Sequence, residues 1–119
     1  MDAQELLSRY AAGERDFSKV NLIQVCLVDA NLIGAHLNGA NLIGANLRGA
    51  DLTNAHLSQA KLNQASLADT EMIGVCLIRA EMIGADLSGT DLTHANLSGA
   101  DLTLFYHSRQ SIIKGDRKN

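Results

Sequence analysis

The segment ANLIGANLRGADLTNAHLSQA, residues 40–60, has a leucine at every fifth residue. On an α-helix, which turns about 100° per residue, these leucines would lie about 140° apart and could not form one apolar face. In a flat strand, a step of five places successive side chains on opposite faces. A backbone that turns a right-angled corner after every pentapeptide directs each leucine to a common axis. Four pentapeptides then close one square coil.

The five-residue period extends without a break from Phe17 to Leu102, which makes 18 consecutive pentapeptides. The residue two before each central residue is mostly alanine, and the residue just before it is often Asn or Asp. All the glycines within the repeat follow the central residue by two positions, where a corner needs φ > 0. We therefore expect an apolar core that includes Phe17, Leu22, Leu42, Leu47, Leu52, Leu57, Met72 and Met82.

The pattern A(D/N)LxG resembles the pentapeptide repeat family, whose motif is A(D/N)LXX, over roughly residues 16–105. The resemblance implies an all-β solenoid, a right-handed quadrilateral β-helix with four pentapeptides per coil and about four and a half coils. The opening QELLSRYAAGERDFS, residues 4–18, is similar to the start of cyanobacterial members of the family. A small cyanobacterial protein is therefore implied.

The two ends of the chain depart from the repeat, as terminal units of solenoids do. We expect an N-terminal helical cap at residues 1–15, with Asp2 and Glu5 as a capping signal and Gly13 as the stop of a helix over residues 3–12. The β-helix then occupies residues 16–105, and a C-terminal cap or basic tail occupies 106–119. Residues 104–113 either cap the last coil or form a dimer seam, so the chain is a monomer or a dimer through its C-terminal end.

The sequence fits a protein of the reducing cytoplasm, and we expect that location. The 119 residues carry a formal net charge of −3, and no apolar run is long enough to span a bilayer. No secretory signal is visible at the start of the sequence. The two cysteines, Cys26 and Cys76, lack a CxxC spacing and are expected to be separate free thiols.

Residues 20 apart in a square coil lie one above the other, so outward side chains form ladders. His36, His56 and Cys76 share one ladder and could converge on a soft metal such as zinc. A straight row is a poor start for a tetrahedral site, and the alternative is a set of exposed polar residues; no other metal and no cofactor is expected. Lys61 and Glu81 share another ladder and are expected to form an ion pair.

Apolar residues also follow several central residues, outside the expected core. We interpret five of them as a candidate protein-binding surface: Ile23, Ile43, Ile73, Ile78 and Ile83. The alternative is that β-branched residues simply suit an extended backbone.

These features favour a protein–protein interaction or scaffold module with an unidentified protein partner, and the resemblance adds a regulatory role in a cyanobacterium. An enzyme is not expected, because a filled prism has no cleft and no catalytic cluster appears. The resemblance also offers an alternative, a DNA mimic that modulates DNA gyrase or topoisomerase. Residues 16–105 carry nine acidic and four basic residues, whereas a duplex of the same length would carry about 13 negative charges. No basic stripe for nucleic acid is present.

Overall fold

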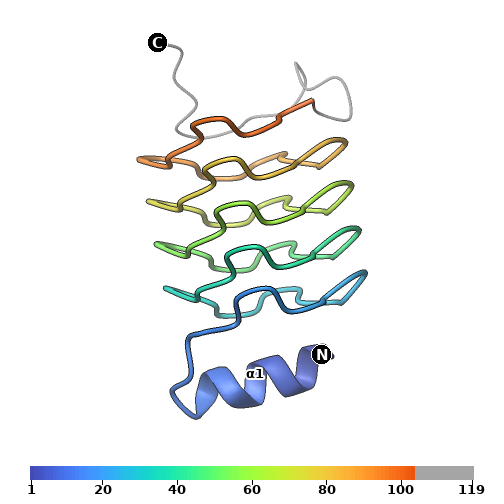
Figure 1. Cartoon of the computed structure of the whole chain (residues 1–119), viewed down its shortest axis with the longest axis vertical. Coiled ribbons are helices and arrows are strands. Elements are labelled where there is room, and N and C mark those ends of the chain that lie inside the picture. Colours follow the sequence, from blue (N-terminus) through green and yellow to red (C-terminus); the bar gives the residue numbers. More distant parts are fainter. Residues whose placement is uncertain (104–119) are drawn as a thin grey trace.

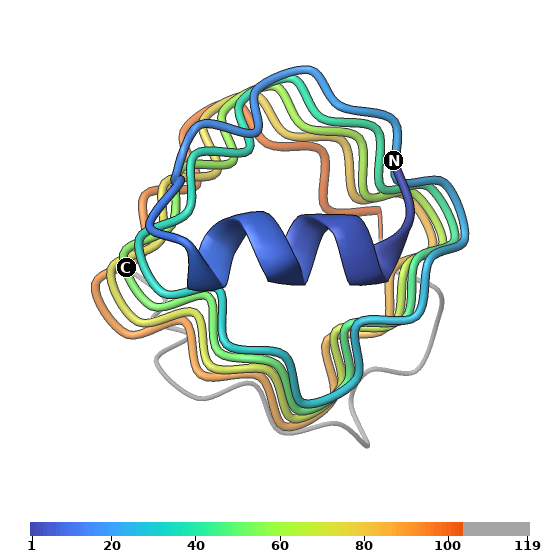
Figure 2. The same ribbon diagram turned by 90° about the horizontal axis from the view of Figure 1, so that it is seen from below.

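A computed structural model describes residues 1–103 of the chain. It contains one helix, α1 (Ala3–Ala11), at the base of a stack of similar coils (Figure 1). Parallel backbone bridges join the residue just before each central residue to the residue 20 positions later, from Asp16↔His36 to Glu81↔Asp101. Viewed along the stack, the coils superimpose as a four-cornered ring (Figure 2). The architecture is a square parallel solenoid with a register of 20 residues, while the expected total of four and a half coils stays a prediction.

Each corner is a tight turn closed by one backbone hydrogen bond. The Ala35 N–H, for example, donates to the Leu32 carbonyl over 3.0 Å, and Gly34 between them has φ +71°. Corners without glycine adopt the same left-handed conformation, as at Asp29 with φ 61°. The closure of the square therefore demands positive φ at every corner and not merely where glycine is present.

Neighbouring coils are joined by three kinds of backbone hydrogen bond. The N–H of a corner residue donates upward, as from Gln24 to the Ile43 carbonyl over 2.9 Å. The N–H of a central residue donates upward, as from Leu22 to the Asn41 carbonyl over 2.7 Å. The N–H of the residue before a central residue donates downward, as from Asn41 to the Val20 carbonyl over 2.9 Å. Because every coil repeats this pattern, stacking leaves backbone edges at the two ends of the solenoid rather than along its sides.

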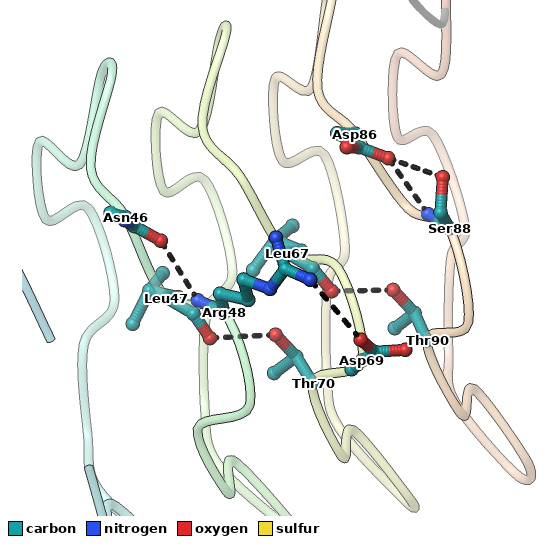
Figure 3. A network of polar contacts seen from close by, with 9 residues as sticks. All are labelled: Asn46, Leu47, Arg48, Leu67, Asp69, Thr70, Asp86, Ser88 and Thr90. Carbon is teal, nitrogen blue, oxygen red and sulfur yellow. Dashed lines mark hydrogen bonds and ion pairs between the residues drawn. The ribbon is translucent and has the colours of Figure 1, made fainter. Parts of the chain in front are cut away.

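The central residues and the alanines fill the axis of the solenoid. All eight expected core residues are at most 1% exposed, and the alanines of the middle coils are also buried. Two threonines stand in the alanine column, Thr70 and Thr90, and both are fully buried. Their hydroxyls donate to the Leu47 and Leu67 carbonyls over 2.8 and 2.7 Å (Figure 3). The buried hydroxyls are thus satisfied by the corner carbonyls of the coil below.

Helix α1 begins at the residue that the sequence indicates and ends close to the expected position. The Asp2 carboxylate accepts from the Glu5 N–H over 2.8 Å, which is the first half of a capping box. The Glu5 carboxylate forms an ion pair with Arg9 at 3.6 Å. The helix ends at Ala11, one residue earlier than expected, and Gly13 follows with φ 104°.

Helix α1 lies across the lower end of the solenoid (Figure 2). Leu6 is fully buried in the same core as the central residues. The Tyr10 hydroxyl donates to the Ile33 carbonyl over 2.7 Å, and the Met1 amino group donates to the Asn21 carbonyl over 3.3 Å. The helix therefore acts as a lid on the apolar axis, as the sequence predicts for this end.

Two expectations fall on residues that are not described. The C-terminal cap or tail at 106–119 and the cap or dimer seam at 104–113 lie outside residues 1–103. Within the described part of the chain, no helix is both long and apolar enough to cross a membrane.

Candidate protein-binding surfaces

The five isoleucines of the expected binding surface differ in their exposure. Ile23 and Ile83 are each 45% exposed, whereas Ile43, Ile73 and Ile78 are half-buried. Ile23 and Ile43 lie on one face in adjacent coils, but Asn63 occupies the next position of that column. The Asn63 side-chain oxygen accepts from the Ile83 N–H over 2.9 Å. The isoleucines of this face are therefore two separate groups rather than one continuous ridge.

A second apolar group surrounds the first coil. Val28 and Ile33 are 42% and 41% exposed, and they follow Ile23 on the next two faces. We call Ile23, Val28 and Ile33 the first-coil belt. The expected set of binding residues omitted Val28 and Ile33. Their signal in the sequence is an apolar residue after the central position in three successive pentapeptides of the coil that lies next to α1.

His36, His56 and Cys76 stack in one column, as the register requires. The two imidazole rings lie 4.5 Å apart between centroids, with 20° between their planes. The Cys76 sulfur instead lies 3.1 Å from the Ser58 hydroxyl. A ring nitrogen lone pair lies in the plane of its ring. Because the two ring planes are nearly parallel, the lone pairs of His36 and His56 do not converge on one ion. Among residues 1–103, no group of three His, Cys, Asp or Glu side chains could hold a metal.

The cysteines are free thiols, as expected. The expected ion pair between Lys61 and Glu81 is absent from the described residues, although their backbones are paired. The Glu81 carboxylate accepts instead from the Asn63 side-chain amide over 3.1 Å. This shorter, neutral donor holds the carboxylate without ordering the long lysine side chain.

The residue before each central residue has a clear local role when it is Asp or Asn. Its side-chain oxygen accepts from the outward N–H two residues later. The Arg48 N–H thus donates to Asn46 over 3.1 Å, and the Ser88 N–H donates to Asp86 over 3.0 Å (Figure 3). Such an Asx turn satisfies a corner N–H that faces outward. The hydroxyl and the N–H of Ser88 together lower the pKa of Asp86, because both stabilise its charged form.

The comparisons with known proteins agree with this geometry. The family described as "Pentapeptide repeats" matches residues 16–54, 50–89 and 77–104. The chain is 67% identical over 27 residues to the uncharacterized protein slr1851 of Synechocystis, which is 23% of this chain and 17% of that protein. The match thus spans less than a fifth of that protein.

Two solved structures of cyanobacterial pentapeptide repeat proteins are similar over longer spans. Rfr23 from Cyanothece 51142 has a TM-score of 0.72 and 34% identity, covering 72% of this chain and 58% of that one. HetL from Nostoc sp. strain PCC 7120 is described as involved in heterocyst differentiation regulation. It has a TM-score of 0.63 and 34% identity, covering 84% of this chain and 44% of HetL.

The family match covers most of the repeat, and the 20-residue register is that of four pentapeptides in each coil. The chain belongs to the pentapeptide repeat family, whose members form right-handed quadrilateral β-helices and are in general non-enzymatic scaffold or interaction proteins.

Proposed function

We propose that this chain is a non-enzymatic protein–protein interaction module. The observation that carries the proposal is the first-coil belt, where three large apolar side chains are between 41% and 45% exposed. The core beside them is complete without these residues, because the central leucines of the same coil are fully buried. The apolar area of the belt thus remains available to another protein.

The rigidity of the solenoid favours such binding. The belt residues are held on a backbone that is hydrogen-bonded to the coil above, at Ile23 through its neighbours Leu22 and Gln24. A preorganised surface loses little conformational entropy when a partner docks, so more of the contact energy appears as affinity. Ile43 and Ile83 lie on the same face as Ile23 and add apolar surface there. Ile73 and Ile78 are the remaining residues of the proposed binding surface.

The proposal includes a cellular setting. The relative HetL is described as acting in regulation of heterocyst differentiation, and a regulatory role in a cyanobacterial cytoplasm is part of the proposal for this chain. The partner is a protein, and the chain is a monomer or a dimer through its C-terminal end. No observation on residues 1–103 favours the DNA-mimic alternative, whose charge requirement the repeat does not meet.

Substitution of the belt should abolish partner capture. The variant Ile23→Ser, Val28→Ser, Ile33→Ser is compared with wild type in a pull-down from cyanobacterial lysate, and captured proteins are identified by mass spectrometry. We expect loss of the captured partner, because truncation of buried apolar contacts at an interface costs about 1–2 kcal/mol or more at the residues that dominate binding. A second variant, Ile43→Ser, Ile83→Ser, measures the contribution of the face above Ile23.

The matched control is Ser18→Ala, Ser98→Ala, which changes exposed residues at the same position of the pentapeptide. It should capture the partner as wild type does. Equal capture by the wild type and both apolar variants would contradict the proposal, and capture of gyrase subunits would support the mimic instead.

A further inference from the structure

One face of the solenoid lacks, in three consecutive coils, the Asx turn that caps outward N–H groups at many other positions. This face consists of residues 15–19, 35–39, 55–59, 75–79 and 95–99, stacked in the 20-residue register. At its lower end, the Asp16 carboxylate accepts from the Ser18 N–H over 3.1 Å. At its upper end, the Asn96 side chain accepts from the Ser98 N–H over 3.1 Å. Between these ends, His36, His56 and Cys76 replace the Asp or Asn.

The three replacements leave three consecutive outward N–H groups without an acceptor. Within residues 1–103, nothing is hydrogen-bonded to the N–H of Asn38, Ser58 or Ile78. We call these three groups the amide strip. The other faces also have uncapped positions, at Val28, Asn63, Ala68 and Ile73, but a capped position always follows in the next coil.

Charge distinguishes the same face. The pentapeptides 35–39, 55–59 and 75–79 contain no Asp or Glu, and their one formally charged residue is the basic Arg79. Each of the other three faces carries at least one carboxylate in the corresponding coils. The stacked imidazoles of His36 and His56 add N–H donors beside the strip.

We propose that the amide strip binds a carboxylate-bearing segment of a protein partner. The partner's carboxylate oxygens take the place that Asp or Asn side chains occupy on the other corners. The geometry of that contact is already present in this chain, at Asp16 and Ser18 on the same face. Hydrogen bonds from N–H groups to an ionised acceptor are stronger than those to a neutral one, which favours acidic side chains over amides.

The spacing of the strip fits an acidic helix. Successive N–H groups are separated by one coil, about 4.8 Å, and an α-helix rises about 5.4 Å per turn. One acidic residue per turn of a partner helix that lies along the solenoid axis can thus reach all three N–H groups. The strip is distinct from the first-coil belt, so each surface can be tested without the other.

The first test is an amide NMR titration of the ¹⁵N-labelled full chain. The probe is a capped helical peptide of about 15 residues, the length at which an isolated helix becomes stable in water, with one glutamate per turn. We expect saturable shifts of the Asn38, Ser58 and Ile78 amides, and none at the capped amides of Ser18 and Ser98. The same peptide with glutamine in place of glutamate should give no saturable shift. Equal shifts with both peptides, or no saturation at the strip, would overturn the proposal.

A second test restores the missing caps. In the variant His36→Asn, His56→Asn, Cys76→Asn, each new side chain can accept from the N–H two residues later, as Asn96 does. The strip shifts should disappear while the melting temperature rises, which separates loss of binding from loss of folding. The matched control Cys26→Asn caps Val28 on another face and should bind the glutamate peptide as wild type does.

The single variant His56→Asn keeps the test decisive if the triple variant is poorly folded. It should remove the shift of the Ser58 amide and weaken binding, with a melting temperature at or above that of wild type. Unchanged peptide binding in this variant, with an unchanged Ser58 shift, would contradict the assignment of the strip.

Discussion

Replacing Leu52 with alanine is expected to lower the free energy of unfolding by about 2–5 kcal/mol, the cost of a cavity at a fully buried leucine. Leu52 is 0% exposed, and its column continues with Leu32 below and Met72 above. The hydrogen bonds that join these coils fix their spacing, so the neighbouring side chains cannot close the gap. Urea unfolding followed by circular dichroism measures the loss.

The control for this substitution is Leu102→Ala. Leu102 occupies the same position of its pentapeptide but is 38% exposed. Its truncation removes less buried surface and should cost markedly less. A cost for Leu52→Ala no larger than that for Leu102→Ala would show that the axis is not a packed core.

Gly49→Ala should destabilise the chain by about 1–3 kcal/mol, mostly through positive φ, with a smaller part from turning the exposed Asp29 carboxylate aside. A Cβ at Gly49 would overlap a carboxylate oxygen of Asp29, the corner residue of the coil below. Gly34 is the control, because its φ is also +71° but nothing lies within 4 Å of an added Cβ. Gly34→Ala should therefore cost about 1–2 kcal/mol, from the backbone conformation alone. Thermal unfolding of the two variants separates the two causes.

A double variant tests the steric part of this account. Asp29→Gly removes the overlapping carboxylate and keeps a residue that tolerates positive φ. Gly49→Ala should therefore cost about as much in the Asp29→Gly background as Gly34→Ala costs in wild type. An unchanged cost of Gly49→Ala in that background would rule out the overlap.

The alternation of large and small corner residues could not be predicted from the five-residue period. The period fixes the register, and the register correctly placed the core and the corners. It does not show that the Asp29 side chain leans over Gly49, or the Asp69 side chain over Gly89. The contact arises where a glycine corner lies directly above a corner residue that has a side chain. It therefore depends on a pair of residues 20 apart and not on the pentapeptide alone.

Exposure of the isoleucines also depends on neighbours in adjacent coils. Ile23 lies in the first coil, which has a coil on one side only, and it is 45% exposed. Ile43 follows in the same column, has a coil on both sides and is half-buried. Ile83 regains exposure where its neighbours in the column are Asn63 and Thr103. The sequence therefore identified the type of residue but not the division of the surface into the belt and a separate upper position.

The measurement that tests the central claim most directly is site-specific photocrosslinking in cyanobacterial cells. A photoreactive amino acid replaces Ile23 in one variant and Ser18 in another, because both are exposed at the same position of adjacent pentapeptides. If the chain is an interaction module that binds through its first-coil belt, position 23 forms a discrete crosslinked product with a partner protein and position 18 does not. No crosslinked product at position 23, or the same products at both positions, would contradict this account.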